Sequence, residues 1–179
     1  MFATRVTVSL FHFLLMVVMS GFVIYLTYRT FIRANPDFDM ENEIKKGNTA
    51  VGLLVGTIIF CASQIMMAGA ESSISMFRLH MLAPAEEGAS LLKVAGLIAA
   101  HLTMSMLLAV VAISVTLRLF GRLTRHMEEG KELQRGNLAV GILLSSVVLV
   151  SSLFIRDGVS ALAKALTPQP SIGRIQIQH

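Results

Sequence analysis

Long runs of apolar residues, separated by short polar segments, dominate the pattern along this chain. Four runs are long enough to cross a lipid bilayer, and they cover about residues 6–28, 49–70, 94–117 and 138–155. A membrane-spanning helix needs about 20 apolar residues to cross a hydrocarbon core of about 30 Å. Because lipid offers no hydrogen-bond partner to the backbone, such segments cross the bilayer as helices. The pattern therefore predicts an all-α membrane protein with four transmembrane helices.

The segments outside these runs are short and polar. The longest, residues 71–93, contains a predicted turn around Pro84 and a predicted interfacial helix at about residues 72–81. Residues 158–166 either extend the fourth helix beyond the bilayer or lie along its surface. Prolines then break the helix, and residues 167–179 are predicted to form an exposed tail.

A twelve-residue segment at the start of the second run recurs at the start of the fourth run. Residues 43–54 (EIKKGNTAVGLL) align with residues 132–143 (ELQRGNLAVGIL) at an offset of 89 positions. The identical pairs within the segment are Glu43/Glu132, Gly47/Gly136, Asn48/Asn137, Ala50/Ala139, Val51/Val140, Gly52/Gly141 and Leu54/Leu143, and the same offset relates His12/His101 and Gly69/Gly158. Seven identities in twelve positions are too many for chance between two apolar stretches.

The repeat predicts two helix–loop–helix units, residues 6–75 and 95–166, joined by a polar outer connection at residues 76–94. Each unit contains two spans, so both units enter the membrane in the same direction. An axis along the membrane normal then relates them, as in parallel-repeat membrane proteins.

The doubled E-x-x-x-G-N-x-A-V-G-x-L motif opens an apolar helix in each unit. This arrangement resembles a bacterial inner-membrane family, number 350 in the series of domains of unknown function. The resemblance covers about residues 6–165 and implies a multi-pass protein of the bacterial inner membrane with four spans. It implies no activity.

Composition narrows the class of protein further. Hydrophobic residues make up 54% of the chain and charged residues only 15%, against about 25% charged in soluble domains. A soluble enzyme, a disordered tail and a disulfide scaffold are thereby excluded, and the lone Cys61 cannot form an intrachain disulfide. No hydrolase, zinc-protease or nucleotide-binding motif occurs. We therefore expect no enzyme, with no catalytic residue, no metal and no cofactor.

The basic residues lie mainly at the ends of the runs. Nine fall in the first and third connections and six on the opposite side, a bias that predicts cytoplasmic connections and both termini outside. We thus expect the basic residues behind the net charge of +4 to interact with the lipid bilayer and not with nucleic acid. The arginines expected to bind anionic lipid or a cytoplasmic partner are Arg29, Arg33, Arg118, Arg122 and Arg125.

The repeated Gly-Asn pair stands at the start of a helix in each unit. Asn48 and Asn137 are suitable N-caps, and the glycine before each permits the preceding turn. Capping is the favoured interpretation. The alternative is that the two asparagines face a central axis and contact an ion or a polar substrate.

Small residues follow on the same helices. The sequence has Gly52 and Gly56 in the second run, matched by Gly141 and Ser145 in the fourth. Small side chains at this spacing let two helix backbones approach closely. We therefore expect packing at these positions, between the second and fourth spans or between copies of the chain.

Three further polar side chains lie within the runs: His12, His101 and Gln64. Structural hydrogen bonding, a proton or ion pathway, and haem or metal ligation are the alternatives for the two histidines, in that order of preference. Arg156, near the end of the fourth run, is expected to pair with Asp157 or Glu71.

Two classes of function follow. In the first, a homo-oligomer forms a small channel or transport-type bundle, and its polar pathway is lined by Asn48, Asn137, His12, His101 and Gln64. In the second, the chain is a non-catalytic interaction subunit of a membrane-stress or envelope complex, with another membrane protein as its partner. A pore needs polar residues along one helical stripe, and in the first span only Ser9, His12, Ser20 and Thr27 qualify, which counts against the channel.

Overall fold

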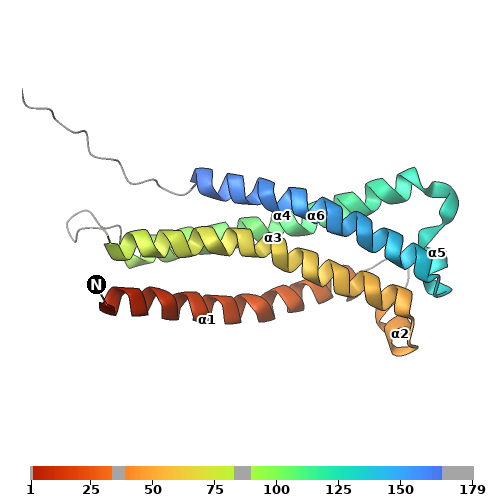
Figure 1. The fold of residues 1–179 in the computed structure, drawn as a ribbon, viewed down its shortest axis with the longest axis horizontal. Helices are drawn as coiled ribbons and strands as arrows, with labels where there is room; N and C mark the ends of the chain where they lie inside the picture. The colour runs from red at the N-terminus through yellow and green to blue at the C-terminus, as the bar shows by residue number, and fades with distance from the viewer. Residues whose placement is uncertain (1, 34–38, 83–89, 167–179) are drawn as a thin grey trace, which may run out of the picture.

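Four long helices make up most of the computed structural model, which describes residues 2–33, 39–82 and 90–166. They run along the long axis of the molecule (Figure 1), and they are α1 (Phe2–Thr27), α3 (Thr49–Leu82), α4 (Leu91–Leu123) and α6 (Leu138–Leu166). Each is long and apolar enough to cross a membrane, and the described ranges contain no strand. The predicted all-α membrane fold is confirmed.

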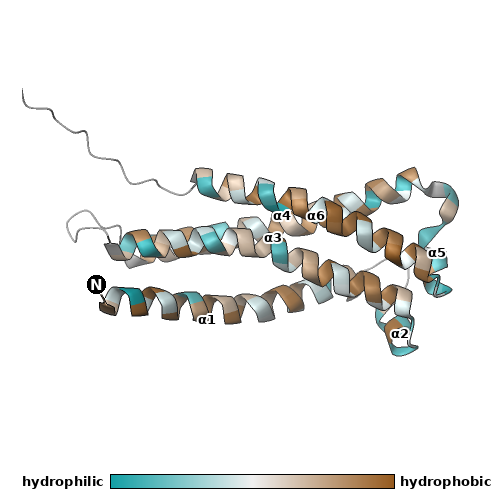
Figure 2. Cartoon of the chain, in the orientation of Figure 1, coloured by the Kyte–Doolittle hydropathy of each residue, from teal (hydrophilic) through white to brown (hydrophobic). Residues whose placement is uncertain are grey.

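Short helical segments connect the long ones. A π-helix, η1 (Tyr28–Arg33), continues α1, and the others are α2 (Met40–Lys45), η2 (Arg125–Met127) and α5 (Glu129–Gln134). Helices α2 and α5 lie at the same end of the molecule, opposite the N-terminus (Figure 1). They are more hydrophilic than the adjoining parts of α3 and α6 (Figure 2). We call α2 with its turn into α3 the first elbow, and α5 with its turn into α6 the second elbow.

Helix α3 is longer than the apolar run that predicted it. It continues through Glu71 to Leu82, so the separate interfacial helix expected at residues 72–81 is the last part of α3. The reason is that residues 70–82 contain neither glycine nor proline, and a single carboxylate does not end a helix. Residues 158–166 likewise continue α6 without a break. The predicted tail, 167–179, lies outside the described residues.

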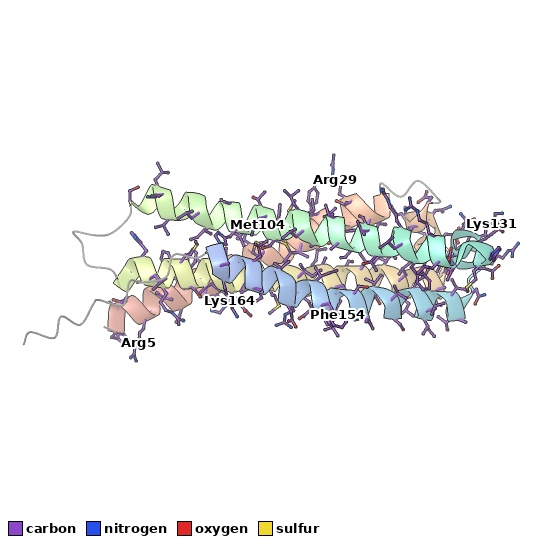
Figure 3. The ribbon with its side chains drawn as sticks, turned by 90° about the horizontal axis from the view of Figure 1, so that it is seen from above. Arg5, Arg29, Met104, Lys131, Phe154 and Lys164 are labelled. Atoms are coloured by element: carbon purple, nitrogen blue, oxygen red, sulfur yellow. The ribbon has the colours of Figure 1, made fainter. Side chains whose placement is uncertain are left out.

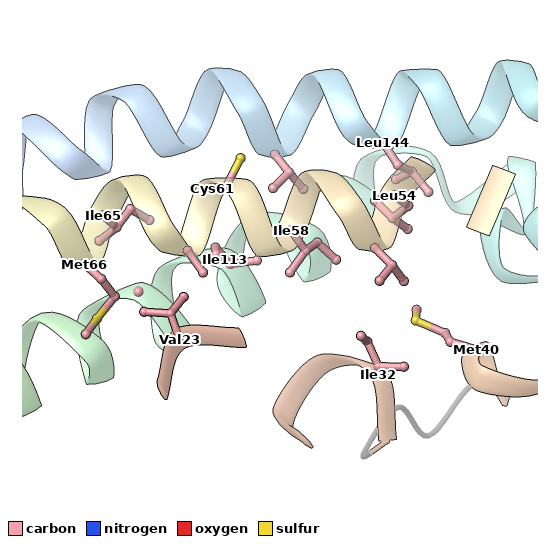
Figure 4. Packing of buried hydrophobic residues seen from close by; sticks show 14 of the residues in the cluster. Val23, Ile32, Met40, Leu54, Ile58, Cys61, Ile65, Met66, Ile113 and Leu144 are labelled. Carbon is pink, nitrogen blue, oxygen red and sulfur yellow. The ribbon is translucent and has the colours of Figure 1, made fainter. Parts of the chain in front are cut away.

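Helix α3 is the centre of the bundle. Half of its most apolar stretch (50%) is buried, against 17% for α1, because α3 packs on α6, α4 and α1 together. Buried residues on different sides of α3 include Cys61, directed toward α6, and Met66, which lies against residues of α1 and α4 (Figure 4). The large apolar side chains left exposed on α1 are suited to a lipid surrounding.

The outer helices pack unequally. Helix α4 packs against both α3 and α6, whereas α1 packs mainly against α3. The division into two equivalent units therefore stays a prediction from the sequence, and α1 and α4 do not have the same surroundings within one chain.

Candidate functional site

A glycine in the left-handed region ends α2 and starts the first elbow turn. Gly47 has φ of +82°, a conformation that disfavours any side chain. Its amide donates to the Ile44 carbonyl at 2.9 Å, and the Asn48 amide donates to the Glu43 carbonyl at 3.0 Å. These two bonds form a Schellman motif, which satisfies the last carbonyls of α2.

The second elbow has the same turn. Gly136 has φ of +78°, and its amide donates to the Leu133 carbonyl at 2.9 Å. The Asn137 amide donates to the Glu132 carbonyl at 3.0 Å. The glycine of the repeated motif is thus required by the backbone in both elbows.

The asparagine side chain caps the long helix that follows. Asn48 Oδ1 accepts from the Val51 amide at 3.2 Å, and Asn137 Oδ1 accepts from the Val140 amide at 3.4 Å. An N-cap satisfies one of the free amides of the first turn and stabilises a helix by about 1 kcal/mol. This geometry matches the capping interpretation of both asparagines.

The glutamate of the first elbow holds the asparagine in place. Glu43 accepts from Lys46 Nζ at 2.8 Å and from Asn48 Nδ2 at 3.1 Å. These hydrogen bonds to Lys46 and Asn48 hold the pKa of Glu43 below its ordinary value. The carboxylate is consequently charged at neutral pH and already engaged on both oxygens.

The glutamate of the second elbow has equivalent partners. Glu132 accepts from Asn137 Nδ2 at 2.8 Å and from Arg135 Nη1 at 2.7 Å. Hydrogen bonds to Asn137 and Arg135 hold the pKa of Glu132 below its ordinary value. No group of three or more metal-ligating side chains occurs in the described ranges. The elbows are therefore built as helix junctions.

The side-chain amide of Asn48 ties the two elbows together. Asn48 Nδ2 donates to the Leu133 carbonyl at 2.7 Å and lies 3.4 Å from the Gln134 carbonyl. Among the described residues, the Asn137 side chain makes no reciprocal hydrogen bond to the first elbow, and its hydrogen bonds are to Glu132 and Val140 of its own unit. The junction is thus asymmetric.

The small residues predicted for helix packing divide into two groups. A methyl group built on Gly141 would lie 2.9 Å from the Ala50 carbonyl oxygen, so α3 and α6 approach closely there, and Ser145 is buried on the same helix. A methyl group on Gly52 or Gly56 would meet no atom within 4 Å. Gly52 and Gly56 therefore make no close helix contact within one chain.

The polar pair between α3 and α6 lies apart from the elbows. Arg156 Nη1 donates to Gln64 Oε1 at 3.3 Å across the α3–α6 contact. The expected ion pair of Arg156 with Asp157 or Glu71 is absent from the described residues, so the neutral amide of Gln64 takes the place of a carboxylate.

The two histidines have different surroundings. His101 is 4% exposed, and its Nδ1 lies 3.0 Å from the Leu97 carbonyl, which can only accept. The proton is therefore on Nδ1, and Nε2 is buried without a partner. His12 is exposed on α1. The structure thus gives the two histidines no common site within one chain.

Some contacts had no signal in the sequence. The Ser152 side chain lies beside the Cys61 thiol, and a methyl group on Gly69 would overlap the Ser105 hydroxyl oxygen. Neither pair belongs to a motif, and only the burial of each helix face identifies it. Of the predicted arginines, Arg29, Arg118 and Arg122 are exposed, and the side chains of Arg33 and Arg125 lie outside the described part.

Four apolar helices with two polar elbows at one end define a polytopic α-helical membrane protein. The chain belongs to the family described as Domain of Unknown Function (DUF350), whose family model matches residues 4–159. No curated protein and no solved structure matches the chain.

Proposed function

We propose that the chain is a subunit of an oligomeric membrane channel or transport-type bundle, with its polar pathway between copies. The observation that carries the proposal is Arg156, a half-buried charged residue of the candidate α6 span Leu138–Ala165 that directly follows the apolar run 138–155. Its partner in the described chain is the neutral Gln64 amide at 3.3 Å. A charged side chain within a span is costly unless it meets a counter-charge or water, so an uncompensated one points to a polar pathway.

The interior of one chain offers this charge no such surrounding. A groove of about 210 Å³ between α1 and α3 is lined mainly by Met16, Met19, Met66 and Met67, and neither Gln64 nor Arg156 lines it. A pathway formed between copies supplies the water or anion that Arg156 requires. Ions or small polar solutes are the class of substrate that fits.

Flux into proteoliposomes tests the proposal. Purified protein should carry chloride or potassium faster than protein-free liposomes, and Arg156→Gln should lower the rate or change the preference between the two ions. Lys164→Gln is the matched control, because Lys164 is an exposed basic residue on the same helix. Wild-type flux equal to that of protein-free liposomes would overturn the proposal.

A second candidate function is that of an interaction subunit in a membrane-stress or envelope complex. The exposed Arg118 and Arg122 favour it, because they lie one helical turn apart near the elbow end of α4. A surface of this kind suits anionic lipid or an acidic protein segment. Retention of anionic lipid that is lost in Arg118→Gln/Arg122→Gln, together with no flux, would favour this function over the channel.

A further inference from the structure

Helices α3 and α6 meet through faces that are not equivalent in the repeat. The contacts pair Ala50 with Gly141, Cys61 with Ser152, and Gln64 with Arg156. None of these pairs joins residues 89 positions apart, the offset of the repeat. The first unit therefore uses one face of its helix and the second unit uses another, which is a heterologous contact.

The face of α6 that corresponds to the buried face of α3 is open. Ala139, Val150 and Leu153, the counterparts of Ala50, Cys61 and Gln64, are all exposed. The contrast is largest between Ile65, which is 0% exposed, and its counterpart Phe154, which is 76% exposed. Phe154 points away from the bundle in Figure 3. One chain thus leaves this α6 face without a protein neighbour.

The complementary face of α3 is open as well. Gly52 corresponds to Gly141, yet a methyl group on Gly52 meets no atom within 4 Å, whereas one on Gly141 would meet the Ala50 backbone. Ser63 and Met67, which correspond to Ser152 and Arg156, are half-buried and exposed respectively, and both line the groove between α1 and α3. The chain therefore presents both halves of a second α3–α6 contact.

A third open contact involves α1. In one chain, α4 packs on α3 where Gly69 meets Ser105 and the backbone of the buried His101. The counterpart of His101 is His12 on α1, which is exposed, and a methyl group on Gly158, the counterpart of Gly69, meets no atom within 4 Å. If α1 lacks a neighbouring copy of the chain in this structure, α1 and α4 would pack as unequally as they do.

We propose that the open α6 face of one copy binds the open α3 face of a second copy and reproduces the α3–α6 contact of the single chain. Ala139 then packs on Gly52 of the second copy, Val150 on Ser63, and Asn137 donates to the Ile44 carbonyl as Asn48 does to Leu133. His12 of the second copy becomes covered by α6. Because both predicted units insert in the same direction, repetition of this contact about the membrane normal closes a ring.

A second copy suits these faces better than lipid. Lipid chains pack on leucine as well as they do on glycine, whereas glycines on an open helix face allow the close backbone approach that helix association uses. The same chain already contains one α3–α6 contact of this kind, and the open α3 face is the surface complementary to the open α6 face. The inference rests on the predicted repeat and deepens the proposed function by naming its partner as another copy.

Disulfide cross-linking in native membranes tests the contact. In a Cys61→Ser background, differently tagged chains carrying Val150→Cys and Ser63→Cys are co-expressed and oxidised with copper phenanthroline. We expect a cross-linked dimer with both tags, and a chain carrying both cysteines should give a ladder beyond the dimer. Ser152→Cys with the native Cys61 is the positive control, since this pair is in contact within one chain.

The matched negative control is Leu149→Cys with Ser63→Cys, because Leu149 is 38% exposed and turned about 100° around α6 from Val150. Cross-linking of Val150→Cys no stronger than this control would overturn the contact. Efficient dimers of Val150→Cys chains alone would also overturn it, since they indicate a two-fold contact instead.

Gly52→Leu provides a second variant, placed where only a glycine fits opposite Ala139. We expect it to shift the solubilised protein to a smaller oligomer while the helical circular dichroism stays unchanged. Gly96→Leu, also in open space, should leave the oligomer intact. A ring that cross-links but conducts nothing overturns the channel alone, and flux without cross-linking overturns this interface alone.

Discussion

The side-chain amide of Asn48 donates a 2.7 Å hydrogen bond to the carbonyl of Leu133, 85 positions further along the chain. This bond joins the start of α3 to the end of α5, so one residue caps its own helix and fastens the two elbows together. The same Asn48 Nδ2 also donates to the Glu43 carboxylate at 3.1 Å. The chemistry of the repeated motif is therefore that of a structural junction.

Loss of this bond should weaken the junction while the cap survives. Asn48→Ser keeps a side-chain oxygen for the Val51 amide but removes the side-chain amide that donates to Leu133 and to Glu43. We expect a loss of about 1 kcal/mol in the free energy of unfolding, the usual net value of a hydrogen bond. Chemical unfolding followed by circular dichroism measures it. Asn42→Ser is the control, since the Asn42 side chain is exposed, and an equal loss in both variants would contradict the assignment.

The elbow glycines should not tolerate a side chain. Gly47→Ala and Gly136→Ala place a methyl group at φ of +82° and +78°, which costs about 1–2 kcal/mol for a left-handed residue. Thermal unfolding should show a lower midpoint for each. Gly56→Ala lies in open space within helix α3 and should be neutral or slightly stabilising, because alanine favours a helix. A lower unfolding midpoint for Gly56→Ala, with unchanged midpoints for the two elbow variants, would contradict this prediction.

The two glycines at the repeated packing position should respond differently. Gly141→Ala forces the α3 and α6 backbones apart, because the methyl group would lie 2.9 Å from the Ala50 oxygen, and overpacking of this kind costs about 1–3 kcal/mol. Gly52→Ala meets nothing within the chain, so it should leave the unfolding free energy of the solubilised single chain unchanged or slightly raised and weaken only assembly. Unfolding and oligomer mass, measured on both variants, separate the two effects.

The elbow carboxylates should make stability depend on pH. The pKa values of Glu43 and Glu132 are lowered in the folded chain by hydrogen bonds to their neighbours. Their contribution is complete above the unfolded pKa, about 4.3 for glutamate, and is lost as the pH falls through the lower folded pKa. The wild type should lose stability below about pH 4 more steeply than Glu43→Gln/Glu132→Gln. Parallel pH profiles of the two proteins would show that these carboxylates contribute nothing.

The thiol of Cys61 should not react with a maleimide while the protein is folded. Its side chain is 0% exposed and directed at Ser152 between α3 and α6. A water-soluble maleimide should label it only after unfolding in SDS. Rapid labelling of Cys61 in intact membranes would mean that α3 and α6 separate.

Much of the fold was predictable because a long apolar run that crosses a bilayer must form a helix to satisfy its backbone hydrogen bonds. Four spans and the Gly-Asn turns follow from hydropathy and from the φ that a glycine permits. The end of α3 was misplaced, because Glu71 interrupts the apolar run without interrupting the helix. The predicted partner of Arg156 was also wrong. Its charge suggested a carboxylate, but the packing of α6 on α3 places Arg156 beside Gln64.

The candidate site was less predictable because residues at equivalent positions have different neighbours. His12 and His101 share the repeat offset, yet one is exposed and the other buried. The Asn48 and Asn137 caps share the same local bonds, yet only Asn48 reaches the other elbow. Such differences arise from how the helices pack, which no twelve-residue motif encodes.

Ion flux per chain, compared between the wild type and Gly52→Leu in proteoliposomes, tests the central claim most directly. An oligomeric channel assembled through the open α3 and α6 faces predicts clear flux in the wild type and its loss in the variant that no longer assembles. Unchanged flux per chain from a monomeric Gly52→Leu protein would contradict a pathway between copies.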